Sequence, residues 1–263
     1  MLLKIAKKIN FRIYSIISIT LWKLRIENWK FLYYKKTRLK KIDLNYFNGK
    51  RVAIIGPAES ALDEKLGNYI DNFEIVIRIN KSVEVINVNK EFIGSKVDIL
   101  FNCLDETPKG GCGKIDVKLW KNSGVKFLFY PLYFSNDRMQ VLKFFFSRSG
   151  GNMKIYEFEY NFYKELRESI KNYYPTTGYS SLFMILKTNP KEIYISGFTF
   201  FQTDHKTSYR DEFINADKVK DFIKTNGHHN PNIEFESFKE LILKSNLNIK
   251  LDVTLNKLIY GSR

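Results

Sequence analysis

The stretch "RVAIIGPAES" (residues 51–60) joins an almost unbroken apolar run to a glycine turn and a serine. A short apolar run rich in Val and Ile that ends at turn residues is typical of a strand buried on both faces of a parallel sheet. Gly56 and Ser60 follow the run, where a backbone amide or a hydroxyl can approach a phosphate. The stretch matches neither GxGxxG nor a Walker loop, so it predicts a strand and a turn but not a specific nucleotide site.

Similar runs recur on the C-terminal side of this stretch. We predict buried strands at 51–57, 73–80, 96–102, 125–131 and 191–198. Segments of helical spacing or composition occur at 61–70, 137–148, 161–174 and 178–189. This alternation predicts an α/β protein with a Rossmann-like, mostly parallel sheet flanked by helices. Residues 51–263 form the predicted domain, and residues 1–50 form a separate, basic segment.

Polar or small residues follow four of the predicted strands. In parallel sheets ligands bind at the carboxyl ends of the strands. An ordinary polar turn is the alternative for each segment taken alone, and their convergence favours a binding site. The residues concerned are Gly56 and Ser60 in "GPAES", Asn80 in "RINKS", Asn102 in "FNCLDE", and Gly197 and Phe198 in "SGFTFFQ".

The stretch "YPTTGYSSL" (174–182) predicts a helix start that can bind an anion. Thr176, Thr177 and Gly178 combine hydroxyl donors, exposed N–H groups and the positive end of the helix dipole. Simple capping would explain one threonine but not the pair with the glycine.

The stretch "NGHHNPNIEFESF" (226–238) predicts another helix start, capped by Asn230 with Pro231 at the first helical position. His229 then lies at the helix N-terminus, where the dipole disfavours the charged imidazolium and favours a ring that accepts a proton. Glu234 lies in the first turns and could orient the histidine or position an acceptor. A His-rich surface turn without catalytic function is the alternative.

The positive charge is concentrated before residue 51. The chain carries +15, and residues 1–50 hold ten Lys and three Arg against Glu27 and Asp43, which leaves +4 for the remainder. The apolar run 13–22 has about half the length of a transmembrane helix, so we predict an amphipathic helix lying on an anionic membrane surface. A helix docked on its own domain or on a partner, and a cleaved signal peptide, are the alternatives. No nucleic-acid-binding signature is present, and we expect no nucleic-acid partner.

The two cysteines, Cys103 and Cys112, form no CxxC motif, which disfavours a structural zinc site or a disulfide framework. A reducing cytoplasm is the simplest location. Together with the basic segment, this predicts a cytoplasmic protein at the inner face of the cytoplasmic membrane.

Three separated segments resemble the large, small and very-small sialylmotifs of the animal-type sialyltransferase family, as in a bacterial member. They are "IIGPAES…IDNFEIVIRINKS", "YPTTGYSSL…EIYISGF" and "HNPNIE", whose His229 and Glu234 match the family's histidine, four residues, glutamate pattern. The similarity spans roughly residues 51–250, and it extends more loosely to other bacterial sialyltransferases. Pro57 stands where the large motif usually has asparagine, so the donor sugar is left open between sialic acid and the similar Kdo.

The resemblance implies a role for each matching residue. Gly56, Ser60, Asn80 and Asn102 would lie near the CMP moiety. The donor's phosphate or carboxylate would meet Thr176, Thr177 and Gly178, and His229 would be the catalytic base. In "TDHKTSYRDEF" (203–213), His205 or Tyr209 would stabilise the leaving phosphate.

We therefore expect an inverting glycosyltransferase that uses CMP-activated sialic acid or Kdo and acts on a saccharide of lipopolysaccharide, lipooligosaccharide or capsule type. No DxD motif is present, so we expect no cofactor and no dependence on a metal ion. The alternative is a non-enzymatic basic module, binding membrane or nucleic acid, on a Rossmann-like scaffold.

Overall fold

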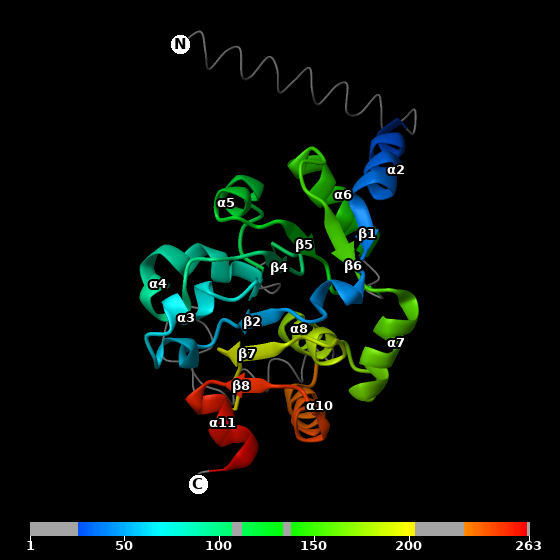
Figure 1. The fold of residues 1–263 in the computed structure, drawn as a ribbon. Helices are drawn as coiled ribbons and strands as arrows, with labels where there is room; N and C mark the ends of the chain where they lie inside the picture. The colour runs from blue at the N-terminus through cyan, green and yellow to red at the C-terminus, as the bar shows by residue number, and fades with distance from the viewer. Residues whose placement is uncertain (1–25, 107–111, 134–137, 203–228, 262–263) are drawn as a thin grey trace.

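One sheet of eight strands forms the centre of the computed structural model, which describes residues 26–106, 112–133, 138–202 and 229–261 (Figure 1). Every pair of neighbouring strands is parallel. The strands are β1 (Leu39–Lys41), β2 (Arg51–Ile55), β3 (Ile75–Ile79), β4 (Ile99–Phe101), β5 (Phe127–Phe129), β6 (Ile155–Glu157), β7 (Glu192–Ser196) and β8 (Ile249–Leu251). The predicted fold class is confirmed.

The strand order is β1-β6-β5-β4-β3-β2-β7-β8. From β2 the chain adds strands in one direction up to β6, and it then returns to add β7 and β8 on the other side of β2. The order therefore reverses between β2 and β7. In open α/β sheets this reversal leaves a crevice at the carboxyl ends of the two strands, where ligands bind.

Alternate side chains of the strands enter two different apolar layers. Val52 and Ile54 of β2 belong to a core with α7 (Tyr160–Ser169), α8 (Thr177–Leu186), α10 (Pro231–Lys244) and α11 (Val253–Tyr260). Ala53 and Ile55 face a core with α3 (Gly67–Asp71) and α4 (Ile86–Ile93). A third core on that second face joins β4, β5 and β6 to α2, α5 and α6. The sheet is thus covered on both faces, which explains the nearly continuous apolar runs of its central strands.

The described α-helices are α2 (Ile26–Arg38), α3 (Gly67–Asp71), α4 (Ile86–Ile93), α5 (Val117–Asn122), α6 (Arg138–Ser149), α7 (Tyr160–Ser169), α8 (Thr177–Leu186), α10 (Pro231–Lys244) and α11 (Val253–Tyr260). Of the four helices predicted between strands, those at α6 and α8 are confirmed. The prediction at 61–70 was wrong in extent, because a short 3₁₀ turn at Glu59–Leu62 precedes α3. Helix α7 ends before the predicted residue 174, since Lys171 and Asn172 have positive φ angles of 53° and 65°.

The described part of the basic segment is attached to the domain. Helix α2 lies beside α6 (Figure 1), and Phe31 is buried against Phe146. Strand β1 pairs with β6 and so belongs to the sheet. The predicted boundary at residue 50 therefore falls inside the folded unit, because an edge strand of three residues gives little sequence signal. No helix in the ranges described is long and apolar enough to cross a bilayer.

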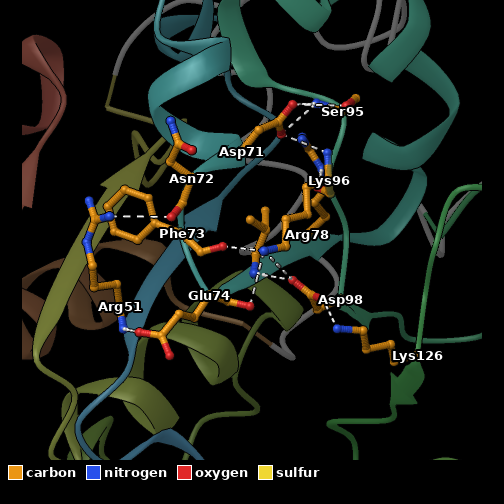
Figure 2. Close-up of polar contacts among 11 residues, drawn as sticks. Arg51, Asp71, Asn72, Phe73, Glu74, Arg78, Ser95, Lys96, Asp98 and Lys126 are labelled. Atoms are coloured by element: carbon orange, nitrogen blue, oxygen red, sulfur yellow. Dashed lines mark hydrogen bonds and ion pairs between the residues drawn. The ribbon is translucent and has the colours of Figure 1, made fainter.

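A buried arginine stabilises the connection from α4 to β4. Arg78, on β3, is fully buried and donates hydrogen bonds to the carbonyl oxygens of Ile93, Gly94 and Lys96 at 2.7, 3.1 and 3.0 Å. Figure 2 shows that Asp71 meets the same connection, where it accepts hydrogen bonds from the backbone N–H groups of Ser95 and Lys96. Burial lowers the pKa of Arg78 to about 10, so its guanidinium is still protonated at neutral pH.

Replacement of this arginine tests its structural contribution. We expect Arg78→Met to lower the free energy of unfolding by about 3 kcal/mol or more, because three buried carbonyl groups lose their charged donor. Urea unfolding with an unchanged m-value would measure the loss. The control is Lys65→Met, which removes the exposed Lys65–Glu91 ion pair and should change stability by only about 0.5 kcal/mol. Equal stability of the two variants would contradict this account.

Candidate active site

The predicted strand-end residues follow four adjacent strands of the sheet. Gly56, Asn80, Asn102 and Gly197 come directly after β2, β3, β4 and β7, which are neighbours in the order β4-β3-β2-β7. Because all of these strands are parallel, the four residues lie along the same edge. The structure therefore brings together residues that are up to 141 positions apart in the sequence.

Gly56 and Gly197 are in direct backbone contact across the reversal point. A Cβ on Gly56 would lie 2.2 Å from the carbonyl oxygen of Gly197, and a Cβ on Gly197 would lie 2.6 Å from that of Gly56. Gly197 also has a φ angle of +77°, which favours glycine. Neither position can accept a side chain without moving the backbone.

The asparagines at the other two strand ends shape the loop after β4. Asn80, with a φ angle of 49°, accepts a hydrogen bond from the backbone N–H of Cys103 at 3.2 Å. Asn102 is buried, and its amide donates to the carbonyl of Cys112 and accepts from the N–H of Leu104. Both side chains thus hold the backbone beside the site.

Helix α8 begins beside the turn that follows β7. A Cβ on Gly178 would lie 3.1 Å from the ring of Phe198, so the predicted anion site and the β7 turn are in contact. Thr176 is the N-cap, and its hydroxyl accepts from the N–H of Tyr179 at 3.1 Å. Thr177 is buried at the first position of the helix.

Helix α10 begins as the sequence predicts. The side chain of Asn230 caps it by accepting a hydrogen bond from the N–H of Ile233, and Pro231 occupies the first turn. His229 precedes the cap, and its Nδ1 lies 2.7 Å from the carbonyl oxygen of Tyr174. A carbonyl oxygen can only accept, so Nδ1 carries a proton, and in the neutral ring the lone pair is then on Nε2. In this tautomer Nε2 is the ring atom that can take a proton.

Glu234 connects the starts of α10 and α8. Its carboxylate accepts hydrogen bonds from the backbone N–H of Thr176 at 2.6 Å and from the Thr176 hydroxyl at 2.7 Å. Glu234 thus orients the threonine cap, where the sequence suggested that it could orient the histidine. Burial raises the pKa of this carboxyl group to about 8, although the two hydrogen bonds from Thr176 act in the opposite direction.

Asp252 was missed by the sequence analysis. It is buried, and its carboxylate accepts hydrogen bonds from the backbone N–H of Gly197 at 2.7 Å and from the Ser60 hydroxyl at 3.3 Å. An Asp before the apolar residues of α11 is a capping signal, but nothing in that signal indicates Gly197 or Ser60 as partners. His205 and Tyr209, and the segment 203–213 that contains them, lie outside the described residues.

The raised pKa of Glu234 predicts a pH-dependent stability. The pKa of this carboxyl group is about 8 in the folded protein and 4.5 in the unfolded chain. Between these pH values the unfolded chain releases the proton while the folded protein still holds it. The free energy of unfolding therefore falls as the pH rises from 4.5 to about 8. Glu234→Gln imitates the protonated form. We expect its melting temperature to match the wild type near pH 4.5 and to exceed it increasingly up to pH about 8.

Thermal unfolding at several pH values would measure this difference. The matched control is Glu240→Gln on the same helix, at an exposed residue paired with Lys244, which should show no such increase. A difference for Glu234→Gln that stays constant with pH would contradict the prediction.

The family model described as glycosyltransferase family 29 (sialyltransferase) matches residues 29–246. No curated protein matches the chain. Among solved structures, a mammalian sialyltransferase in complex with Gal-beta-1-3GalNAc-ortho-nitrophenol has a TM-score of 0.49 and 15% identity, over 86% of this chain and 85% of that chain.

Two structures from Campylobacter jejuni are also similar. The monofunctional alpha-2,3-sialyltransferase Cst-I has a TM-score of 0.49 and 17% identity, over 81% of this chain and 78% of that chain. The sialyltransferase CstII in complex with a substrate analogue, CMP-3FNeuAc, has a TM-score of 0.47 and 17% identity, over 77% of this chain and 81% of that chain. The family model covers most of the sequence, and the chain therefore belongs to glycosyltransferase family 29, the sialyltransferase family.

Proposed function

We propose that this protein transfers sialic acid from CMP-sialic acid to a hydroxyl group of a saccharide acceptor, with inversion at the anomeric carbon. Family membership supports the reaction class. The observation that carries the proposal is the geometry of His229, whose Nδ1 donates to the Tyr174 carbonyl and leaves the lone pair on Nε2. A neutral imidazole in this tautomer, just before the N-cap of α10, can remove the proton from an acceptor hydroxyl.

The proposed reaction is a single displacement. The acceptor oxygen forms a bond to the anomeric carbon while the bond from that carbon to the CMP phosphate oxygen breaks, and CMP leaves with the electron pair. The acceptor proton passes to Nε2 of His229. His205 or Tyr209 would stabilise the charge on the departing phosphate, as the resemblance implies.

The donor site would lie at the carboxyl ends of β2, β3, β4 and β7. Thr177 has a hydroxyl group that makes no hydrogen bond to any described residue, and it lies at the N-terminus of α8. With Gly178 it would meet the carboxylate or phosphate of the donor. Glu234 would act indirectly, because its carboxyl oxygens accept two hydrogen bonds from Thr176 and so position it.

The protein would act on a surface saccharide of lipopolysaccharide, lipooligosaccharide or capsule type, from the inner face of the cytoplasmic membrane. The excess of basic residues before residue 51 supports attachment to anionic lipid. Salt-sensitive flotation of the full chain with anionic liposomes would support this location, and flotation that does not depend on lipid charge would contradict it.

A donor screen tests the function directly. Purified protein is incubated with CMP-sialic acid, CMP-Kdo, or uridine and guanosine sugar nucleotides, in excess EDTA and with a panel of saccharide acceptors. We expect transfer from CMP-sialic acid without added metal, since the sequence has no DxD motif. If sugar is transferred only from CMP-Kdo, the donor sugar is Kdo and not sialic acid. If activity in EDTA is restored only by Mg²⁺ or Mn²⁺, the enzyme depends on a metal ion.

The histidine has a sharper test. We expect His229→Ala to lower kcat by about 10²–10⁴-fold, the usual contribution of a positioned base, while CMP binding stays near the wild-type value. His228→Ala is the matched control from the same turn and should be much milder. Comparable losses in both variants would make the turn structural, and full activity of His229→Ala would remove the histidine from the mechanism.

A further inference from the structure

A single buried carboxylate joins three segments next to the proposed donor site. Asp252 is 3% exposed. Its Oδ2 accepts hydrogen bonds from the Gly197 N–H and the Ser60 hydroxyl, and its Oδ1 accepts from the N–H of Leu255 at 2.7 Å, which caps α11. The turn after β7, the loop after β2 and the start of α11 thus share one acceptor group.

Asp252 is itself held against the sheet. Its backbone N–H donates to the carbonyl of Ile195, on β7, at 3.0 Å. Gly197 is then bound on both sides, because its N–H donates to Asp252 and its carbonyl accepts from the N–H of Ala58 at 3.0 Å. The carboxylate therefore fixes the glycine that contacts Gly56 at the reversal point of the sheet.

The contacts continue from Gly197 to the predicted anion site. Phe198 follows Gly197, and its ring lies against Gly178 at the start of α8. A shift of the Gly197 turn would therefore move the aromatic ring on which the start of α8 rests. The Ser60 hydroxyl donates a hydrogen bond to Asp252, so this serine contributes to the scaffold of the site.

We propose that Asp252 is a positioning residue of the donor site, which sets affinity for the CMP-sugar through Gly197 and Ser60 without touching the substrate. The inference rests on the proposed function, and it adds a residue that lies outside all three motif-like segments. Burial raises the pKa of Asp252, so its carboxylate depends on the surrounding N–H and O–H donors for its ionised form.

The test separates this role from the capping of α11. Serine is a good N-cap, so Asp252→Ser keeps a partner for the Leu255 N–H, but its shorter side chain does not reach Gly197 and Ser60. We expect the KM for the donor, and the Kd for CMP measured by calorimetry, to rise about tenfold or more, as for loss of hydrogen bonds to a charged group. The KM for the acceptor should stay within about twofold of the wild type, because this contact lies on the donor side.

Two further variants complete the design. Asp252→Asn has one acceptor oxygen where the carboxylate has two, so its NH2 group must face the N–H of either Gly197 or Leu255. We expect this variant to weaken donor binding as well, because the loss of either contact loosens the side chain that holds Gly197. It provides a second measurement if Asp252→Ser does not fold. Thr254→Val is the control on the same helix, because it removes only a surface hydrogen bond to Asp63 at 3.0 Å. We expect the control to leave the donor KM unchanged.

The outcomes distinguish this inference from the proposed function. If the wild-type protein neither binds CMP nor transfers sialic acid, both fail together. If the wild type is active and the Asp252 variants keep the wild-type donor KM and CMP affinity, the positioning role is overturned and the function stands. If the loss of kcat equals the unfolded fraction of the variant and the donor KM is unchanged, Asp252 likewise contributes only to stability.

Discussion

The close backbone contact between Gly56 and Gly197 is the constraint on which the proposed site depends. The two glycines follow strands that neighbour each other only because the strand order reverses at β2. Their approach lets the turn after β7 lie against the turn after β2, and it places Phe198 under the start of α8. Residues from both halves of the sequence can then surround one ligand. A side chain at either glycine would separate the turns and the residues that follow them.

Two helix-capping residues near this contact also form hydrogen bonds with distant segments of the chain. Thr176 and Asp252 each cap a helix, and each also binds a distant segment, Glu234 in one case and Gly197 in the other. The starts of α8 and α11 are thereby attached to elements near the proposed site. Exposed N–H groups at helix starts favour negative charge, and the proposed donor carries both a phosphate and a carboxylate. Local helix stability and donor recognition would therefore depend on some of the same hydrogen bonds.

The sequence predicted strands β2, β3, β4, β5 and β7, the starts of α8 and α10, and the strand ends where Gly56, Asn80, Asn102 and Gly197 lie. These features depend on local apolar runs and capping residues. Strands β1, β6 and β8 were missed, because each has three residues that include a charged one, whereas the equally short β4 and β5 are wholly apolar. The pairing of the missed strands is decided by distant partners. The bonds of Glu234 to Thr176 and of Asp252 to Ser60 could not be predicted for the same reason. Local sequence identifies a cap or an acid, but only the folded chain determines what it meets.

The position of β1 and β8 has a consequence for how the chain reaches its native state. The first and last strands form the two open edges of the sheet, and Lys41 binds the Phe158 carbonyl, 117 residues further along. Contacts of such long range close slowly, so the N-terminal edge stays incomplete until β6 has been synthesised. During that time α2, which packs against α6, is not yet docked either. Both finished edges are short and carry lysine side chains, Lys40 and Lys41 on one and Lys250 on the other, which discourages strand addition by other molecules.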